Sequence, residues 1–474
     1  MNIKKYFLSL AAGMALFATG CDKLSDFGDT NVNPNGIPDP IPAALFTNVS
    51  AGIPGYAGIA TPGYYAQLFS ETQYTDASLY SVVQFNFSGT YSGHLYDLQN
   101  IINGNTSNNL TQAARIMQQY IFWTMTDRVG DIPYSEALKG SEIQNPKYDT
   151  QEEVYKGMIA TLKDAASKFD NTSLISGDIS NYKGDPESWR RLANTMRMLM
   201  AQQLSKKFPG PTGYAATEFK AALADGVIDE NSENWSYAFP GGNLSNPWYN
   251  TYNGRRDVAQ SKTMTDIMVS LADKRQAAYG ADVNGNYTEK GVPYGLARAK
   301  AEAFTSANPD WAYVLAPRFR QQTSTVTVIP AAAATLARAE AADCGWTNEN
   351  AAQLYEQGIR LSHEQWGVAA PTAAYFAQSS VALGATGNCA NLKKIATQRW
   401  IAVYPDGLQA WNVWRRTGFP ELTPAPDAVN DGKQIPRRYT YSPALYSSNA
   451  EGIALAVDRL PGGDKISSRV WWDQ

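Results

Sequence analysis

The stretch ATQRWIAVYPDGLQAWNVWRRTGFPEL, residues 396–422, contains three of the chain's 12 tryptophans. Trp411 and Trp414 lie one helical turn apart and therefore share a face of a helix. Arg415 or Arg416 can then stack on an indole ring or form an ion pair with an acid. For most individual Trp and Tyr residues of a large helical protein, packing in the core is the expected role.

Amphipathic helices are predicted along much of the remaining chain. In DTQEEVYKGMIATLKDAASKF, Thr150 and Glu153 form a capping-box pattern ahead of an apolar face. In GDPESWRRLANTMRMLMAQQL, Asp185 can cap a helix whose first turn accommodates Pro186. Further helices are predicted at Leu110–Thr126, Ala351–Trp366 and Asn391–Val403.

Strand signals are sparse, and the clearest is TSTVTVI at Thr323–Ile329, where β-branched residues cluster. Between the helices lie long stretches rich in Gly, Asn and Tyr. Stretches of this length are usually functional loops or contain additional structure. They span Tyr56–Asn109, Gly226–Arg256 and Ala281–Arg320. We therefore expect a helix-pair scaffold that carries long loops.

Length and charge narrow the class of protein. With 474 residues, the chain can form one large domain or two or three smaller ones. Its net charge of -4 and pI near 5.5 argue against nucleic-acid binding, which requires a basic surface. Tyr outnumbers Phe, 27 to 16, and Tyr and Trp suit half-wet surfaces such as sugar platforms and protein interfaces.

The N-terminus has the pattern of an export signal. Lys4 and Lys5 precede an apolar run, Tyr6–Thr19, which is too short to span a bilayer and fits a signal-peptide core. Small residues then lead to Cys21. We predict a lipoprotein signal at residues 1–20 and lipid attachment at Cys21, which would tether the mature protein to a membrane. The alternative is an ordinary secretory signal that happens to end beside a cysteine.

Cysteine and histidine usage gives little support to a metal site. Cys344 and Cys389 are the only other cysteines, and in an exported protein they either pair or remain separate buried thiols. His94 and His363 are the only histidines, and neither lies near a cysteine pair in the sequence. We predict no cofactor, although a structural cation such as Ca²⁺ remains an alternative.

Signatures of calcium binding and of catalysis are weak. DTNVNPNG at Asp29 and DVNGNYTE at Asp282 resemble calcium loops, but both lack required positions and are better interpreted as Asn-rich turns. The chain has no GxSxG, HExxH, Walker A or GxGxxG motif. A glycosidase carboxylate pair cannot be recognised among 44 acidic residues. The sequence therefore gives no support to an enzymatic function.

Several stretches together resemble the SusD/RagB family of nutrient-binding outer-membrane lipoproteins of Bacteroidetes, in its NPN-containing branch. They occur in the expected order over nearly the whole mature chain, and the segment from Gln398 to Leu422 is the most specific. The stretches are DTNVNPNG, RVGDIPYSEALKG, PKYDTQEEVY, WRRLANTMRMLMAQQLS, EQGIRLSHEQWGV, ATQRWIAVYPDGLQAWNVWRRTGFPEL, IPRRYTYSP and SSRVWWD.

The resemblance implies a single domain at residues 21–474 that is mostly α-helical, with tetratricopeptide-like helix pairs, little β structure and loops forming the ligand face. It also implies a partner, a SusC-like TonB-dependent transporter, over which the protein acts as a hinged lid. The lid would capture an oligosaccharide at the cell surface, on the outer membrane, and release it to the transporter without cleaving any bond.

Candidate ligand residues follow from loop context and composition. Aromatic rings can stack on sugar rings, while amide and guanidinium groups hydrogen-bond hydroxyls. We predict that the ligand residues lie in NPWYNTYNGRR, with a second group in the early loop SETQYTDASLYS. They are Asn246, Trp248, Tyr249 and Tyr252, followed by Tyr74 and Tyr80. Trp400, Trp411, Trp414, Arg415 and Arg416 are assigned to the scaffold, because they lie in the segment most typical of the family.

Two alternatives to a glycan-binding lipoprotein remain open. The same fold and partner can serve peptide cargo, for which backbone-pairing edges and charged pockets would replace exposed aromatic residues. A surface glycoside hydrolase is the second alternative, and it requires two carboxylates in a cleft, about 5–5.5 or 6.5–9.5 Å apart.

Overall fold

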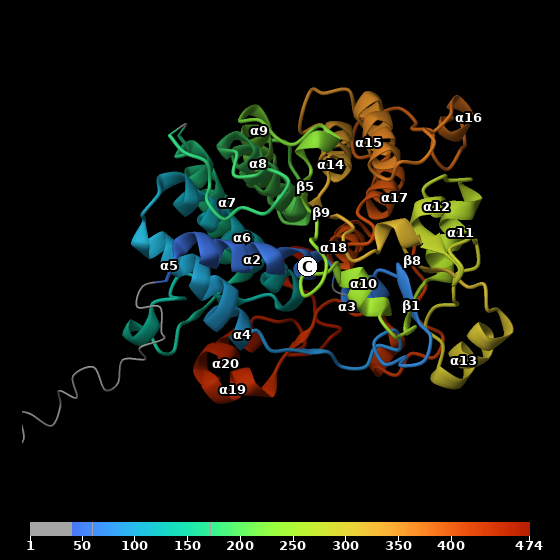
Figure 1. Ribbon diagram of the computed structural model, residues 1–474, viewed down its shortest axis with the longest axis horizontal. Coiled ribbons are helices and arrows are strands. Elements are labelled where there is room, and N and C mark those ends of the chain that lie inside the picture. The colour runs from blue at the N-terminus through green and yellow to red at the C-terminus, as the bar shows by residue number, and fades with distance from the viewer. Residues whose placement is uncertain (1–39, 59, 171) are drawn as a thin grey trace, which may run out of the picture. The chain divides into compact units, whose positions relative to one another are not determined.

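The computed structural model describes residues 40–58, 60–170 and 172–474, and helices dominate this part of the chain (Figure 1). The α-helices are α2 (Pro42–Ala57), α3 (Ala60–Tyr65), α4 (Ser88–Thr90), α5 (Tyr96–Gly104), α6 (Asn108–Val129), α7 (Gln151–Ser167), α8 (Pro186–Gln203), α9 (Tyr214–Ala224), α10 (Pro247–Tyr252), α11 (Lys262–Ser270), α12 (Gln276–Tyr279), α13 (Arg298–Ala307), α14 (Ala331–Asp343), α15 (Ala351–Gln365), α16 (Ala373–Phe376), α17 (Leu392–Ala402), α18 (Gly407–Thr417), α19 (Pro443–Ser448) and α20 (Ala450–Asp458). Short helical turns are η2 (Tyr91–Leu95), η3 (Gly140–Glu142), η4 (Leu204–Lys206), η5 (Asn231–Glu233), η6 (Pro317–Phe319), η7 (Asp431–Lys433) and η8 (Trp471–Asp473). The predicted fold class, mostly α-helical with little β structure, is confirmed.

The helices pack as neighbouring pairs. From α5 to α9, each helix packs on the next, and α14 packs against both α15 and α17. Helix α17 in turn packs on α18, and α18 packs on α3. Contacts between α8 and α14 join the two runs, and Figure 1 shows these helices side by side. This arrangement is the helix-pair scaffold that the sequence predicted.

The predicted helix caps are present. The backbone N–H of Glu153 donates to Oγ1 of Thr150 at 3.2 Å, and the N–H of Thr150 donates to the Glu153 carboxylate at 2.8 Å. The Asp185 carboxylate accepts from the N–H of Ser188 at 2.9 Å, directly before Pro186. These side chains satisfy N–H groups that have no partner in the first turn of a helix.

In the described residues, the strands are short and form two-stranded pairs. Strand β9 occupies the end of the stretch predicted as a strand at Thr323–Ile329. The antiparallel pairs are β1 (Phe69–Glu71) with β6 (Val258–Gln260), β3 (Ile132–Pro133) with β4 (Tyr148–Asp149), β5 (Trp235–Tyr237) with β9 (Val326–Ile329), and β7 (Gly280–Ala281) with β8 (Tyr313–Val314). Strand β10 (Thr440–Tyr441) pairs in parallel with β2 (Gln84–Phe85).

The three long stretches between the predicted helices are not plain loops. Helices α2, α3 and α5 lie in or overlap the first, α10 lies in the second and α13 in the third. The sequence missed α2 because its polar and apolar residues do not separate cleanly onto two faces, and it missed α10 because it is only six residues long. These stretches therefore contain the additional structure that their length allowed.

The segment at 396–422 is part of the buried core. Trp400 and Trp411 are fully buried, and their indole N–H groups donate to the carbonyl oxygens of Ala66 and Pro436 at 3.1 and 3.0 Å. The Arg415 guanidinium lies 3.6 Å from the Trp411 ring centroid. The scaffold assignment is confirmed for these residues.

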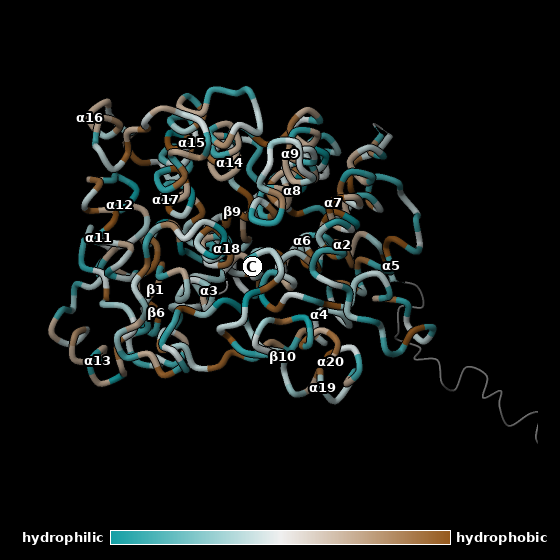
Figure 2. The backbone as a smooth tube through the Cα atoms, turned by 180° about the vertical axis from the view of Figure 1, so that it is seen from behind, coloured by the Kyte–Doolittle hydropathy of each residue, from teal (hydrophilic) through white to brown (hydrophobic). Residues whose placement is uncertain are grey.

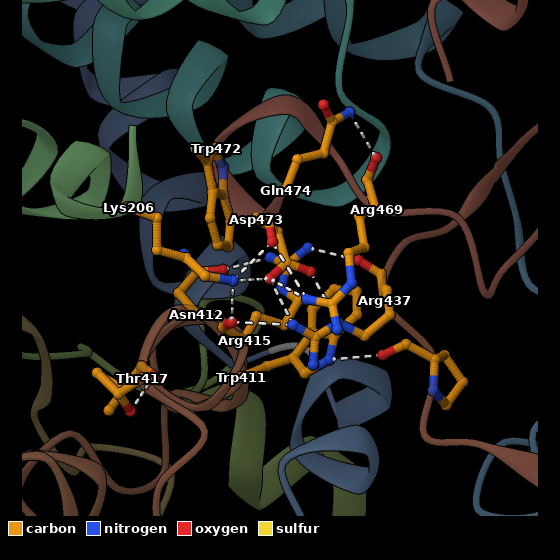
Figure 3. Close-up of polar contacts among 12 residues, drawn as sticks. Lys206, Trp411, Asn412, Arg415, Thr417, Arg437, Arg469, Trp472, Asp473 and Gln474 are labelled. Atoms are coloured by element: carbon orange, nitrogen blue, oxygen red, sulfur yellow. Dashed lines mark hydrogen bonds and ion pairs between the residues drawn. The ribbon is translucent and has the colours of Figure 1, made fainter. Parts of the chain in front are cut away.

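Both arginines of the Arg–Arg pair behave as predicted. Arg416 forms an ion pair with the buried Glu340, with Nη2 at 2.7 Å from Oε2. Arg415 lies between the rings of Trp411 and Trp472, and Asp473 lies close by at the end of the chain (Figure 3). One arginine therefore stacks on indoles and the other pairs with an acid.

Cys344 and Cys389 form a disulfide, which settles the alternative that the sequence left open. The bond ties the C-terminal end of α14 to the segment that precedes α17. The two elements also pack directly on each other.

The calcium-like stretch at Asp282 is a turn. Its carboxylate accepts from the backbone N–H groups of Asn284 and Asn286 at 2.9 and 2.8 Å. The similar stretch at Asp29, the signal peptide and Cys21 lie outside the described residues. Within residues 40–58, 60–170 and 172–474, no cluster of His, Cys, Asp and Glu could hold a metal ion.

Apolar residues are interspersed with polar ones along the helices, as Figure 2 shows for the long helices α6 and α8. None of the helices in the described part of the chain combines the length and hydrophobicity that a bilayer span requires.

Candidate functional site

A groove of about 790 Å³ brings together two segments that the sequence marked as candidates. One wall comes from the chain after β1 and the other from the chain after α10, with α13 at the side. We call it the Tyr74 groove. The residues that define it are Gln73, Tyr74, Arg255, Arg256, Glu302 and Trp311.

Pairing between β1 and β6 places the two walls side by side. The strands are antiparallel, with Phe69 opposite Gln260. The pairing continues beyond β1, where Thr72 donates its N–H to the carbonyl of Asp257 at 3.0 Å and its hydroxyl to the carbonyl of Arg256 at 2.6 Å. Tyr74 therefore lies next to the residues that follow α10.

A row of packed aromatic rings extends from the lining of the groove into the protein. Trp311, which lines the groove, stacks on Tyr313 with ring centroids 4.1 Å apart, and Tyr313 lies 5.2 Å from Tyr252. The hydroxyl of Tyr252 donates to the carbonyl of Val258 and accepts from the N–H of Val314, both at 2.8 Å. Burial raises the pKa of Tyr252. Tyr252, predicted as a ligand residue, therefore holds β6 and β8 together under the groove.

Tyr74 is the exposed aromatic residue of the groove, with 52% of its surface accessible. The guanidinium groups of Arg255 and Arg298 lie 5.5 and 5.6 Å from its ring centroid. Arg298 donates from Nε to the Glu302 carboxylate at 2.8 Å, and this hydrogen bond raises the pKa of Arg298. The groove thus presents an aromatic ring, guanidinium groups and carboxylates to solvent, a combination that can bind a polar ligand with an apolar face.

Two other predicted residues, Asn246 and Trp248, line a second cavity of about 530 Å³ that we call the Trp366 pocket. Trp248 is only 2% exposed and packs against Phe69, with ring centroids 5.1 Å apart. Asn246 is fully buried and caps α10 by accepting from the N–H of Trp248 at 2.7 Å. Both side chains hold α10 in place, so most of their surface is used inside the protein.

Tyr249 and Tyr80 have different surroundings. Tyr249 is half-buried, and its hydroxyl accepts from Nε2 of Gln322 at 2.9 Å. Tyr80 is fully buried, and its hydroxyl accepts from the N–H of Ala425 at 2.8 Å. The expectation that Tyr80 faces a ligand is contradicted by this burial, because its loop folds inward and the ring packs 6.2 Å from Tyr65.

The Trp366 pocket also contains a buried carboxyl group. The Asp406 carboxylate caps α18 by accepting from the N–H groups of Leu408 and Gln409, both at 3.0 Å. Burial raises the pKa of Asp406 to about 7, against the opposing effect of these hydrogen bonds. The position of this group at a helix cap gives it a structural role.

A third cavity, of about 860 Å³, lies among α5, α6 and the chain after β3, and we call it the Gln118 cleft. Tyr96, Gln99, Gln118 and Lys139 line it. None of the predicted ligand residues lies there. The Tyr74 groove is the better candidate because it brings an exposed predicted residue together with the segment that follows the other predicted residues.

Sequence reasoning missed the arginines and the α13 side of the groove. Arg255 and Arg256 belong to the quoted stretch NPWYNTYNGRR, but they had no feature that distinguished them from other surface arginines. Glu302 and Trp311 lie in the stretch 281–320, for which the sequence predicts a long loop or additional structure. No local signal could have placed them beside Tyr74, because the contact depends on pairing between strands distant in sequence.

Comparison with known proteins identifies the family. A family model named SusD-like and described as "Starch-binding associating with outer membrane" matches residues 34–442. No curated protein is significantly similar to this chain.

Solved structures match over nearly their whole length. A chitin-binding SusD homologue from Flavobacterium johnsoniae is 27% identical, with a TM-score of 0.79, over 91% of this chain and 98% of that chain. A SusD homologue from Bacteroides uniformis is 24% identical, with a TM-score of 0.80, over 92% of this chain and 100% of that chain. A SusD-like protein from Bacteroides thetaiotaomicron is 22% identical, with a TM-score of 0.77, over 91% and 98% of the two chains. Since the family model covers most of the sequence, this chain belongs to the SusD-like family.

Proposed function

We propose that the protein captures an oligosaccharide in the Tyr74 groove at the outer-membrane surface and passes it, uncleaved, to a SusC-like TonB-dependent transporter. The observation that carries the proposal is the exposed ring of Tyr74, surrounded by arginine, glutamine and carboxylate side chains in an open groove. An aromatic ring can contact the apolar face of a sugar while such polar groups bind its hydroxyls.

Family relationships support carbohydrate as the cargo. The family is described as starch-binding, and the relative from Flavobacterium johnsoniae as chitin-binding. The two carboxylates of the groove, Asp257 and Glu302, are engaged in ion pairs with Arg255 and Arg298. This arrangement suits recognition better than proton transfer to a glycosidic oxygen.

Transfer of the oligosaccharide to the transporter is explained by the predicted lipid anchor at Cys21. A lipid on Cys21 would hold the protein at the membrane while leaving it free to swing over its transporter. The ligand would then move from the groove into the transporter when the lid closes.

Isothermal titration calorimetry of the mature chain carrying Cys21→Ser, and therefore lipid-free, tests the proposal. The panel contains starch, chitin and pectin oligosaccharides and mixed peptides, with product analysis after each titration. We expect saturable binding of one oligosaccharide class, recovered intact. Cleaved product, or binding of peptides alone, would refute the proposal.

A matched pair of variants locates the site. Tyr74→Ala should weaken binding at least tenfold, because it removes the exposed ring of the groove. Tyr96→Ala removes a ring of similar exposure, 46%, from the Gln118 cleft and should leave affinity unchanged. The reverse result would place the ligand in the Gln118 cleft.

A further inference from the structure

The residues that line the Tyr74 groove include two arginines and two carboxylates, and a third arginine reaches it from α13. Arg255 and Arg256 line it, and Arg298 reaches the Tyr74 ring from α13. The carboxylates among its lining residues are Asp257 and Glu302. Three guanidinium groups thus face two carboxylates, in a chain whose overall net charge is -4.

The ion pairs in the groove use the Nε atoms of Arg255 and Arg298 and leave their Nη atoms able to donate hydrogen bonds to a ligand. Arg255 and Arg298 each donate from Nε, to Asp257 and Glu302 respectively. Their Nη atoms make no hydrogen bond to any described residue. Arg256 is exposed and forms no ion pair within residues 40–58, 60–170 and 172–474. Each arginine therefore has free N–H donors that can point into solvent or toward a ligand.

Free guanidinium donors favour one kind of ligand group. The planar N–H fork of arginine matches the two oxygens of a carboxylate or sulfate, and such charged hydrogen bonds are stronger than those to neutral hydroxyls. Arg255 and Arg298 also lie against the Tyr74 ring, so a sugar that contacts this ring lies within reach of their remaining Nη–H donors.

Resting on the proposed function, we infer that the cargo is an acidic oligosaccharide, with carboxylate or sulfate groups on its sugar rings. Tyr74 contacts a sugar ring, and the arginines bind the acidic substituents on either side. The inference narrows the substrate class without changing the mechanism of capture.

An acidic peptide would offer the same charged groups, but the strands beside the groove, β1 and β6, already have backbone partners. The N–H of Thr72 is already bonded to the carbonyl of Asp257, and the N–H of Gln260 to the carbonyl of Ala312 at 2.8 Å. A peptide binding by strand addition needs unpaired backbone groups at a sheet edge. The β1–β6 pair is therefore closed to strand addition at these positions, and the test includes an acidic peptide to decide between the two kinds of cargo.

Two matched ligand pairs test the inference by calorimetry on the lipid-free mature chain. The first is an oligogalacturonide and its methyl ester, which keeps the rings and hydroxyls but removes the charge. The second is a carrageenan oligosaccharide and its desulfated form. We expect one acidic member to bind at least tenfold more tightly than its neutral partner, and to weaken at least tenfold between 50 and 500 mM NaCl. The pair that responds distinguishes carboxylate from sulfate.

Arg256→Gln is the informative variant, because this side chain forms no ion pair with the described residues, so its loss should not disturb their packing. It should weaken binding of the acidic ligand about tenfold and binding of its neutral partner only about twofold, because Gln loses the charge but still donates hydrogen bonds to hydroxyls. Lys139→Gln, which removes one positive charge from the Gln118 cleft, is the control and should have no effect.

The outcomes separate this inference from the proposed function. Neutral oligosaccharides that bind as tightly as acidic ones would overturn the inference and leave oligosaccharide capture intact. Binding of an acidic peptide such as oligoglutamate, with no binding of any oligosaccharide, would overturn both.

Discussion

Asp406 is a buried acid whose titration couples to folding. Burial raises its pKa to about 7 in the folded protein, whereas an unfolded Asp titrates near its ordinary value of about 3.9. Between these values the folded protein retains a proton that the unfolded chain has released. The stability that this group contributes is therefore complete below about pH 4 and is lost as the pH rises through about 7.

Asp406→Asn should remove this dependence while keeping the helix cap, because asparagine is also a good N-cap residue. Relative to the unchanged protein, we expect the variant to gain about 2 kcal/mol of unfolding free energy between pH 5 and pH 8. Urea unfolding at the two pH values measures the gain. Glu71, whose pKa burial raises to about 7, titrates in both proteins and cancels in the comparison. If the difference in unfolding free energy between variant and parent is the same at pH 5 and pH 8, the pKa of Asp406 is not raised.

Asp473 is a fully buried residue near the C-terminus whose carboxylate forms ion pairs with several cationic side chains (Figure 3). Its Oδ1 lies 2.8 Å from Nζ of Lys206 and 3.0 Å from Nη1 of Arg469, and the carboxylate also pairs with Arg437. Removing a buried charge leaves its partners uncompensated, which typically costs about 3–5 kcal/mol.

Asp473→Asn should therefore lower the unfolding free energy by about 3 kcal/mol in urea titrations. Arg469→Gln serves as the control, because its side chain is 49% exposed. A half-exposed partner should contribute less than about 1 kcal/mol. Similar costs for the two variants would show that the carboxylate is less important than its burial suggests.

At the scale of elements, α3 and α18 approach unusually closely at two glycines. A Cβ on Gly407 would lie 2.3 Å from the backbone nitrogen of Gly63 and 2.5 Å from its Cα. Backbone atoms cannot move aside cheaply, so the two helices would have to separate.

Gly407→Ala should destabilise the protein by about 2–3 kcal/mol, as overpacking of a rigid contact does. Gly55→Ala is the control, because Gly55 lies on the exposed side of α2 with open space around its Cα. That change should be neutral or stabilise by up to about 1 kcal/mol, since alanine favours the helix. Thermal unfolding of the two variants gives the comparison, and a stable Gly407→Ala protein would mean that α3 and α18 can separate freely.

The Cys344–Cys389 disulfide also constrains how elements pack, because it links α14 to the segment before α17. It closes a loop with a sequence separation of 45 residues between the end of α14 and the start of α17. Loops of this length restrict the unfolded chain and typically give about 2–4 kcal/mol. Replacing both cysteines with alanine should lower the unfolding free energy by that amount, measured in urea. An unchanged midpoint would show that packing between α14 and α17 alone fixes their arrangement.

For the molecule as a whole, the sequence predicted elements better than their arrangement. Helices with capping signals, such as α7 and α8, were placed within a few residues, because caps and apolar periodicity are local. The sequence also predicts a scaffold role for Trp411 and stacking or ion pairing for Arg415 or Arg416, and the structure shows which arginine does which.

The groove was harder to predict because it is built from contacts between distant segments. Tyr74 was identified as a candidate, but only the β1–β6 pairing places it beside Arg255 and Arg256. Asn246 and Trp248 were chosen for their side-chain chemistry, and a short helix uses them internally. The prediction for Tyr80 was wrong for a similar reason, because a tyrosine in an apparent loop can pack into the protein as well as face solvent.

The location and fate of the cargo are tested most directly by a crystal structure of the lipid-free mature protein with the tightest-binding oligosaccharide from the calorimetric panel. We predict an intact oligosaccharide in the groove, with one sugar ring against Tyr74 and hydrogen bonds from Arg255 or Arg256. A ligand bound in the Gln118 cleft, or one found cleaved, would contradict oligosaccharide capture at this site.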